Sequence, residues 1–256
     1  MEAAKTNRFN DAGGGKAIKS LRVRAVLAAA VLGILFGAAP LSAQFEFQAD
    51  VMSKYIWRGF DLYDDNNPAL QPSVTYSFGE SGFSITAWAS FALGERSVYK
   101  DYDEIDLTLN YDFQLSDQVG MSVGFIQYGY YFGGKDICKE NTTQEFYVSA
   151  GLPETFLAPT LTAYYDVNLG SGLYVLLEAS HSVPLSENVG LDLSAELGYN
   201  GKQFIDESGL SDLTIGASLP ITLGNWTIAP QVNYTFVFLD SVNEDNEFWF
   251  GISIIR

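Results

Sequence analysis

The sequence predicts an all-β protein, a transmembrane antiparallel up-and-down β-barrel of about 12 strands preceded by a cleaved signal peptide. Three observations lead to this prediction. Apolar and polar residues alternate along most of the chain, the alternating segments are mostly 8 to 13 residues long, and most of the links between them are alternately short and long. Membrane strands span roughly 9 to 11 residues, whereas strands of soluble sheets usually span about 5 or 6. The segment lengths therefore favour a membrane barrel.

The alternation is clearest in residues 104–113, where apolar side chains occupy the odd positions and polar side chains the even ones. A strand sends these two sets to opposite faces, while a helix would place Ile105 beside Thr108 and leave no apolar stripe. The same pattern predicts strands over residues 45–57, 70–78, 83–91, 104–113, 119–130, 143–150, 160–166, 173–183, 189–199, 212–219, 226–236 and 247–255.

Most links between these strands follow the pattern of bacterial outer-membrane barrels, in which short periplasmic turns alternate with longer outer loops. The short links are residues 79–82, 114–118, 184–188 and 220–225, and the longer ones are 58–69, 92–103, 131–142, 202–211 and 239–246. Residues 151–159 form a rather long turn and residues 167–172 a short loop. Alternation alone also fits a soluble barrel with an apolar interior, so these link lengths favour the membrane barrel.

Aromatic residues on the apolar faces gather toward the two ends of the predicted strands, as in the aromatic girdles of membrane barrels. The girdle on the turn side would contain Phe45, Phe47, Tyr76, Phe78, Phe83, Tyr111, Phe113 and Trp226. The girdle on the loop side would contain Tyr55, Trp57, Phe91, Phe125, Phe146, Tyr165, Tyr199, Tyr234, Phe236 and Phe248.

The N-terminus has the organisation of a secretory signal peptide. Four basic residues between Lys16 and Arg24 lead into the apolar run 25–39, and the small residue Ala43 precedes the predicted cleavage site. This run of about 15 apolar residues is shorter than the roughly 20 that a membrane-spanning helix needs. We therefore expect a signal peptide over residues 1–43 and, over residues 44–256, a barrel exported through the periplasm to the bacterial outer membrane.

The chain is strongly acidic, with 14 basic and 31 acidic residues and a formal net charge of −17. Such a surface repels the phosphates of nucleic acids, so we expect no nucleic-acid partner. One cysteine, Cys138, and one histidine, His181, supply neither a disulfide framework nor the usual metal ligands, so no cofactor or metal is expected. His181 and its neighbour Ser182 would point to opposite faces of a strand, which disfavours a serine hydrolase. The sequence predicts no enzyme.

One segment carries a family resemblance. Residues 53–60 read Ser-Lys-Tyr-Ile-Trp-Arg-Gly-Phe, and an Asp/Asn-rich link then leads to Pro68-Ala69-Leu70-Gln71. This aromatic-Arg-Gly step followed by a Pro-Ala-Leu-Gln strand entry resembles the opening hairpin of the TorF-type porins, a bacterial family of unknown function (Gcw_chp). The resemblance extends over nearly all of residues 44–256. It implies an outer-membrane barrel treated as a pore, without established substrate or catalytic residues.

The polar faces of the predicted strands carry mainly acidic residues. Twelve point inward on this register, Glu46, Asp50, Glu104, Asp106, Asp112, Glu145, Asp166, Glu178, Asp192, Glu196, Asp212 and Glu247, against two basic residues, Lys54 and Arg58. The residues expected to line a pore are Asp50, Lys54, Arg58, Asp106, Glu178, Asp192 and Glu196.

The predicted turn at 184–188 would set Ser180 opposite Asp192 and Leu176 opposite Glu196, with Glu178 diagonal to both carboxylates. These three acids would then repel one another or hold a cation. In the alternative, Lys54 or Arg58 neutralises them and plugs the lumen.

The predicted function is an outer-membrane, porin-like channel for small solutes. It should be narrow, since twelve strands lie between a filled barrel of eight and a wide pore of sixteen to eighteen. It should prefer cations because the inward residues are mainly acidic. Two alternatives remain open, a non-conducting structural or adhesive barrel and a barrel enzyme that acts on lipid. Expected partners are outer-membrane lipid and lipopolysaccharide, small solutes or cations, and the barrel-assembly machinery, which would recognise the C-terminal strand at 249–256.

Overall fold

The computed structural model describes residues 44–63, 66–99, 102–131 and 142–256. The predicted signal peptide, Cys138, Asp64 and Asp65 lie outside these ranges. The long strands are β1 (Phe45–Met52), β4 (Ala69–Ser77), β5 (Phe83–Ala92), β6 (Asp103–Ser116), β7 (Val119–Tyr131), β8 (Thr142–Gly151), β9 (Thr160–Asp166), β10 (Leu173–Ser186), β11 (Val189–Gly201), β12 (Ser208–Ser218), β14 (Trp226–Val237) and β15 (Glu247–Ile255). Shorter elements are β2 (Ile56–Trp57), β3 (Phe60–Asp61), α2 (Arg96–Tyr99) and β13 (Ile221–Leu223).

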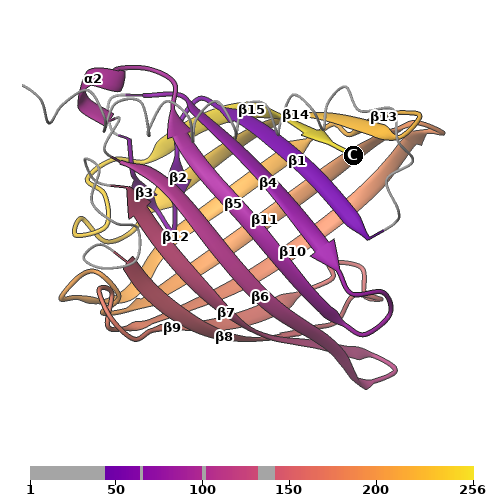
Figure 1. Cartoon of the computed structure of the whole chain (residues 1–256), viewed down its shortest axis with the longest axis horizontal. Coiled ribbons are helices and arrows are strands. Elements are labelled where there is room, and N and C mark those ends of the chain that lie inside the picture. Colours follow the sequence, from indigo (N-terminus) through magenta and orange to yellow (C-terminus); the bar gives the residue numbers. More distant parts are fainter. Residues whose placement is uncertain (1–43, 64–65, 100–101, 132–141) are drawn as a thin grey trace, which may run out of the picture. The chain divides into compact units, whose positions relative to one another are not determined.

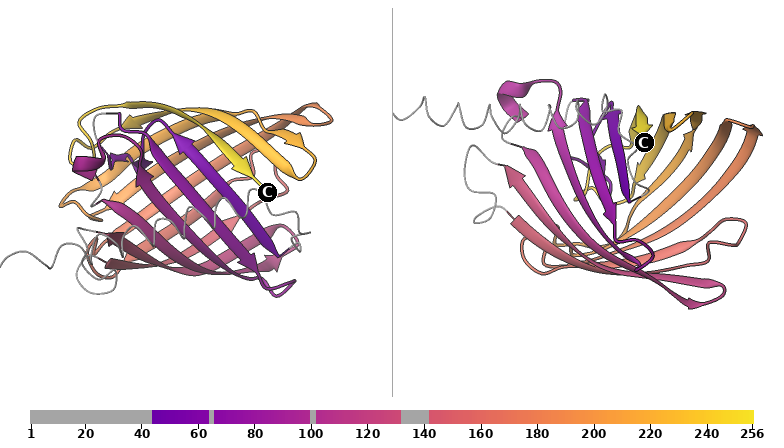
Figure 2. Two further views of the ribbon diagram at one scale, coloured as in Figure 1. Left: turned by 45° about the horizontal axis from the view of Figure 1, so that its top comes forward. Right: turned by 45° about the vertical axis from the view of Figure 1, so that its right-hand side comes forward.

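The long strands form a closed antiparallel barrel (Figure 1; Figure 2). Strands that follow one another in the sequence pair as neighbours, and β15 pairs with β1 from Gln48↔Ile255 to Met52↔Gly251, which closes the ring. The short strand β13 follows β12 after a break and pairs with β11 and β14, as β12 does, so β12 and β13 together form one strand of the barrel wall. The predicted twelve-stranded barrel is therefore confirmed.

The two faces of the barrel differ as a membrane requires. On β6, Leu107 and Leu109 expose about half of their surface on the outside, with relative exposures of 51% and 47%. Asp106, on the other face, is buried in the lumen. Aromatic rings border this apolar surface at the start of β5, where Phe83 lies 4.4 Å from Tyr111, and a second pair, Phe125 and Phe146 at 5.2 Å, lies level with Leu109 in the middle of the strands. An apolar outer face around a polar interior is the arrangement of a transmembrane barrel.

Within the described ranges, no helix has the length and apolar character needed to span a membrane.

The first strand is shorter than predicted. It ends at Met52 instead of residue 57, and residues 53–63 then fold into the barrel as a hairpin built on β2 and β3, which we call the inner hairpin (Figure 1). Arg58 and Gly59 have φ values of 52° and 85°, and two successive residues with positive φ are the signature of a tight type I′ hairpin turn. This turn reverses the chain within the lumen and sets Trp57 opposite Phe60.

The inner hairpin also corrects the predicted aromatic girdle. Tyr55 and Trp57 do not lie on the outer face, because Tyr55 is buried against Tyr63 at 5.3 Å and Trp57 packs against Tyr128 at 6.0 Å. Alternation continues without a break from β1 into β2, so period two alone does not show where the chain leaves the barrel wall.

The register of the β10–β11 hairpin differs from the prediction. Glu178 lies directly opposite Glu196, whereas Ser182, and not Ser180, lies opposite Asp192. The reason is that β10 continues to Ser186, which pairs with Val189, so the turn is tighter than the predicted link 184–188. The three acids therefore form a facing pair, Glu178 and Glu196, and a separate carboxylate on Asp192.

Candidate functional site: a lumen with two unlike halves

The inner hairpin is part of the link between β1 and β4. It occupies the end of the lumen where the link between β5 and β6, which holds α2, also lies (Figure 1). We call this the loop end and the opposite end, where residues 78–82 and 187–188 lie, the turn end. The inner hairpin is tied to several staves of the wall. The Tyr63 hydroxyl lies 3.0 Å from the Ser90 hydroxyl of β5, the Tyr55 hydroxyl donates to Glu104 of β6 at 2.9 Å, and Lys54 forms an ion pair with Glu247 of β15.

Arg58 stands at the tip of the inner hairpin and reaches across the lumen to β8. Its Nη1 and Nη2 donate to the two carboxylate oxygens of Glu145 at 2.6 and 2.9 Å, and Nη1 also donates to Oε1 of Gln203 at 2.5 Å. The Arg58 side chain is 8% exposed and that of Glu145 is fully buried. Glu145 accepts further bonds from Tyr128 at 2.8 Å and from Gln203 at 2.5 Å. Together these bonds satisfy a carboxylate that would be costly to bury without partners.

Three aromatic rings enclose the guanidinium of Arg58. Its Cζ lies 4.5 Å from the ring centroid of Trp57, 4.4 Å from that of Tyr164 and 4.5 Å from that of Tyr174, all within the range of cation–π attraction. Burial lowers the pKa of Arg58, but Tyr128 and the bonded Glu145 raise it, and the net result is a pKa above the ordinary arginine value. Arg58 is thus a permanent cation held at the centre of the loop end.

Gly59 brings the backbone of the inner hairpin against the opposite side of the barrel. A Cβ atom at this position would meet Cγ1 of Val242 at 2.9 Å and Cβ of Asp212 at 3.1 Å. The carbonyl of Gly59 accepts a bond from the Nδ2 of Asn243 at 3.4 Å. Only glycine combines the positive φ with this close approach, which explains the Arg-Gly step in physical terms.

The turn end of the lumen is different. Glu178, Glu196 and Asp192 are partly exposed on β10 and β11, and none of them has an ion-pair or hydrogen-bond partner among the residues that the structure describes. Asp50, on the inner face of β1, accepts bonds from the Gln48 amide at 3.0 and 2.9 Å. A cavity of about 400 Å³ on this side is lined mainly by hydroxyl and amide side chains; it contains Ser84, Thr86, Thr108, Asn110, Asp112, Ser122, Ile126, Tyr147, Ser149, Thr162 and Tyr164.

The structure thus divides the seven residues expected to line a pore between the two halves. Lys54, Arg58 and Asp106 lie at the loop end, where Asp106 is buried and accepts a bond from the backbone N–H of Gly129 at 3.2 Å. The other four, Asp50, Glu178, Asp192 and Glu196, line the rest of the wall. Lys54 and Arg58 do neutralise carboxylates and fill part of the lumen, but their ion-pair partners include Glu247 and Glu145 and none of the three acids for which this was considered.

Several residues of this centre had not been singled out from the sequence. Glu145 was one of twelve inward acids, and Gln203 and the tyrosines around the Arg58–Glu145 pair carried no signal of their own; these are Tyr128, Tyr164 and Tyr174. The one available signal was Arg58 itself, an arginine within an aromatic segment. Its partner is 87 positions away, and only the curvature of the closed barrel identifies it.

The histidine considered for a hydrolase, His181, contacts the link between β8 and β9. The Nδ1 of His181 lies 2.9 Å from the Phe156 carbonyl, and its ring packs on Phe156 at 4.1 Å. The described residues contain no group of three or more His, Cys, Asp or Glu side chains that could hold a metal ion.

A closed barrel with an apolar outer face and a polar, charged lumen defines the class of transmembrane β-barrel proteins. The chain belongs to the Gcw_chp family, described as bacterial proteins of unknown function, whose family model matches residues 38–250. No curated protein matches the chain.

Solved structures share the fold at low sequence identity. The KdgM porin has a TM-score of 0.54 and 11% identity, and the alignment covers 82% of this chain and 98% of KdgM. The NanC porin has a TM-score of 0.50 and 11% identity, with coverages of 82% and 98%. LpxR from Salmonella typhimurium has a TM-score of 0.50 and 8% identity, with coverages of 82% and 99%. Two of these three neighbours are porins by name.

Proposed function

We propose that the protein is a porin-like channel of the bacterial outer membrane, narrow and cation-preferring, for small solutes. The fold it shares with the KdgM and NanC porins supports a channel. The observation that carries the charge preference is the turn end of the lumen, where Glu178, Asp192 and Glu196 have no basic partner in the described structure. A passage lined by one sign of charge attracts ions of the other sign.

The inner hairpin supports a narrow passage. Twelve strands enclose less space than the sixteen to eighteen of wide aqueous pores, and here Tyr55, Trp57 and Arg58 occupy part of that space. The same observation favours a second candidate, a structural barrel that does not conduct because the inner hairpin seals it.

The ligand of one fold neighbour does not suit the acidic lumen of this chain. One KdgM structure is described as a complex with disordered oligogalacturonate, an acidic sugar chain. The carboxylates of the present lumen would repel such a polyanion. We therefore propose a different solute class for this chain.

The resemblance of residues 53–60 to the TorF-type porins favours the same channel function. We further propose that residues 1–43 are removed on export, that β15 is the strand recognised by the barrel-assembly machinery, and that outer-membrane lipid and lipopolysaccharide surround the apolar outer face. Sequencing the N-terminus of the protein recovered from an outer-membrane fraction tests the first point, with residue 44 expected as the first residue.

Reversal potentials in planar bilayers test the channel and its charge preference. Under a KCl gradient the protein should conduct and favour potassium, and the double variant Asp192→Asn with Glu196→Gln should weaken that preference. The matched control is Glu187→Gln, which removes one charge from the exposed turn between β10 and β11. Anion selectivity of the parent protein would contradict the proposal, and the absence of conductance would favour the sealed barrel.

A further inference from the structure

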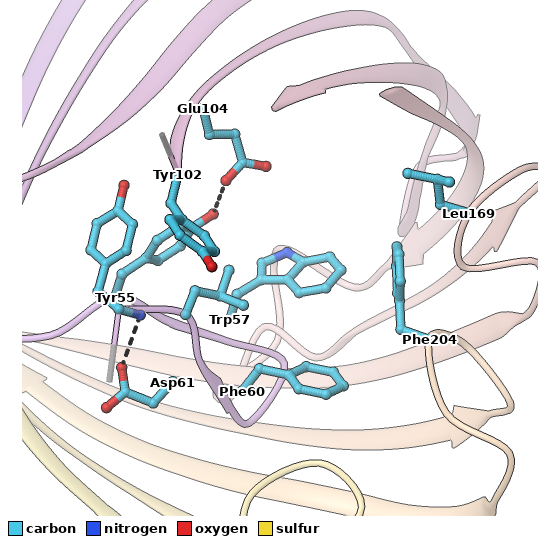
Figure 3. A pocket seen from close by; sticks show the side chains of 10 residues that line it. Tyr55, Trp57, Phe60, Asp61, Tyr102, Glu104, Leu169 and Phe204 are labelled. Atoms are coloured by element: carbon cyan, nitrogen blue, oxygen red, sulfur yellow. Dashed lines mark hydrogen bonds between the residues drawn. The ribbon is translucent and has the colours of Figure 1, made fainter. Parts of the chain in front are cut away.

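The two ends of the lumen hold cavities with different linings. At the loop end, a cavity of about 460 Å³ beside the inner hairpin is lined largely by aromatic side chains, among them Trp57, Phe60 and Phe204 (Figure 3). The cavity of about 400 Å³ toward the turn end extends from Ser84 on β5 to Thr162 on β9, and we call it the hydroxyl cavity. Its volume falls within the roughly 300 to 1,000 Å³ of small-molecule sites, so it can hold a small solute.

Short hydroxyl side chains form much of the wall of the hydroxyl cavity. Thr86 lies directly opposite Thr108, and Ser149 lies opposite Thr162 with their hydroxyl oxygens 2.9 Å apart. Each hydroxyl can donate one hydrogen bond and accept two, so a bonded pair keeps capacity for a ligand. Among the described residues that line the cavity, Asp112 alone is charged. The lining therefore offers mainly neutral donors and acceptors, which suit the hydroxyl groups of a ligand better than they suit an ion.

The ring of Tyr147 lies face down on the wall of this cavity. A Cβ built on Gly124, directly opposite on β7, would lie 2.4 Å from both Cε1 and Cζ of Tyr147 and 2.5 Å from its Oη. A point in the ring plane that is equally distant from these three atoms would be much closer to them, so the Cβ position lies above the ring face. Because glycine has no Cβ, the ring can lie against β7 and turn its other face to the lumen.

Hydrogen bonds hold polar groups beside this ring. The Tyr147 hydroxyl donates to Oδ1 of Asn110 at 2.5 Å, which leaves the Nδ2 of Asn110 as a donor without a partner in the described structure. Oδ1 of Asp112 accepts a bond from the Ser122 hydroxyl at 2.5 Å, which leaves Oδ2 as an acceptor. An aromatic face is thus bordered by an amide donor and a carboxylate acceptor.

The hydroxyl cavity lies next to the tip of the inner hairpin. Tyr164 lines the cavity, and the centroid of its ring lies 4.4 Å from Cζ of Arg58. A solute held in the cavity would therefore lie where the inner hairpin narrows the passage.

We propose that the hydroxyl cavity binds uncharged sugars in their six-membered ring form, with the free face of Tyr147 as the stacking surface. The C–H groups on one face of such a sugar are apolar and weakly positive, so they suit the negative face of an aromatic ring. The hydroxyl groups at its edge are donors and acceptors, so they suit the polar groups around Tyr147. The role as a solute site of the channel rests on the proposed function, whereas binding itself does not require conduction.

Four probes separate the features of this ligand: methyl glucoside, sorbitol, 1,4-cyclohexanediol and glucuronate. Titration calorimetry on the folded protein should use an amine-oxide detergent, because glucoside detergents would compete for the cavity. Methyl glucoside should bind about fivefold more tightly than sorbitol, which has hydroxyls without a ring, and than the diol, which has a ring with few hydroxyls. Glucuronate should bind more weakly because Asp112 repels it. Equal affinities for the four probes, or no binding of methyl glucoside, would overturn the inference.

One pair of variants assigns the binding to this cavity. Tyr147→Ala should reduce the affinity for methyl glucoside about fivefold and change the affinity for sorbitol little. The matched control is Tyr165→Ala, which removes an exposed ring from the outer face of β9. Circular dichroism confirms that each variant retains its β-structure. Unchanged affinity for methyl glucoside in Tyr147→Ala would overturn the inference.

A second pair of variants moves the ring and keeps Tyr147 itself. Gly124→Ala places a methyl group where the ring lies and should tilt the ring off the wall, so the affinity for methyl glucoside should fall about threefold. Gly120→Ala is the control, because it lies on the same face of the same strand and its Cβ would come no nearer than 3.7 Å to another residue. Equal affinities in these two variants would contradict the role of Tyr147 as the stacking surface.

The sugar site and the channel can fail separately. Potassium conductance without binding of methyl glucoside would overturn the sugar site and leave the channel intact. Binding without conductance would support the sugar site and overturn its role in transport. In a conducting protein, methyl glucoside should reduce the potassium current with the affinity found by calorimetry, and Tyr147→Ala should require a higher sugar concentration for the same reduction.

Discussion

The two halves of the lumen use the same residue types in opposite ways. At the loop end, Glu145 and Glu247 are buried and paired with arginine and lysine from the inner hairpin. At the turn end, Glu178 and Glu196 face each other across two strands without a cation between them in the described structure. An inward-pointing carboxylate in a barrel therefore cannot be assigned to a structural or a transport role by its direction alone. The presence or absence of a cationic partner distinguishes the two roles.

The largest effect is expected from breaking the pair at the loop end. Glu145→Ala leaves the charge of Arg58 buried without a carboxylate, which should cost about 3 to 5 kcal/mol of unfolding free energy. Urea unfolding in lipid vesicles measures this loss. Single-channel conductance should rise because the inner hairpin loses its hold on β8.

The control for this change removes both charges together. Arg58→Met with Glu145→Leu replaces a buried ion pair by apolar side chains, which should cost less than Glu145→Ala. An equal loss in the two proteins would mean that the carboxylate acts through packing and not through its charge.

A smaller effect is expected at the turn of the inner hairpin. Gly59→Ala must fit a Cβ 2.9 Å from Val242 at a φ of 85°, whereas Gly224→Ala has a φ of 64° with no atom within 4 Å. Both substitutions carry the backbone penalty, so the difference between them isolates contact within the lumen. Gly59→Ala should lower the unfolding free energy by about 1 to 3 kcal/mol more than Gly224→Ala. Equal values would show that the inner hairpin is not packed against Val242.

One hydrogen bond of the inner hairpin can be removed without altering charge. Burial raises the pKa of Tyr63, and its hydroxyl lies 3.0 Å from the Ser90 hydroxyl. Tyr63→Phe should cost about 0.5 to 1.5 kcal/mol in the same unfolding measurement. Tyr76→Phe is the control, because its hydroxyl bonds Gln44 in an exposed position, and it should cost less. A greater loss at Tyr76 would contradict the stated role of the inner hairpin.

The smallest expected effect is an increase in the unfolding free energy, from a substitution at the turn end. Glu178→Gln removes the repulsion from Glu196 directly across the strand pair and should raise the unfolding free energy by about 0.2 to 1 kcal/mol. Glu187→Gln, in the exposed turn of the same hairpin, should change it less. A destabilised Glu178→Gln protein would indicate that an interaction with the carboxylate outweighs the repulsion.

The sequence predicted the barrel wall well, since each stave repeats one simple rule. Alternation through residues 104–113 is a local property, and β6 is found there with Leu107 outside and Asp106 inside. The tight turn at Glu187 and Asn188 was placed less well, because a change of two residues in register depends on turn geometry that alternation does not encode.

The candidate site was predictable only in outline. The sequence indicated an acidic interior with Lys54 and Arg58 as its basic side chains, and it left open the alternative that these neutralise acids and fill the lumen. It did not indicate that residues 53–63 leave the wall, because Tyr55 and Trp57 continue the period of β1. The choice of Glu145 among twelve acids depends on which staves face one another across the closed ring.

The reach of Arg58 from the link after β1 to β8 has a mechanical consequence. In a simple ring each stave is held only by its two neighbours, so the cross-section can flatten without breaking any backbone ladder. The inner hairpin connects non-adjacent strands through the interior of the barrel. Tyr63 bonds to β5, Tyr55 to β6 and Arg58 to β8. The loop end is therefore braced against changes in lateral pressure from the bilayer, and deformation of the barrel is left to the turn end.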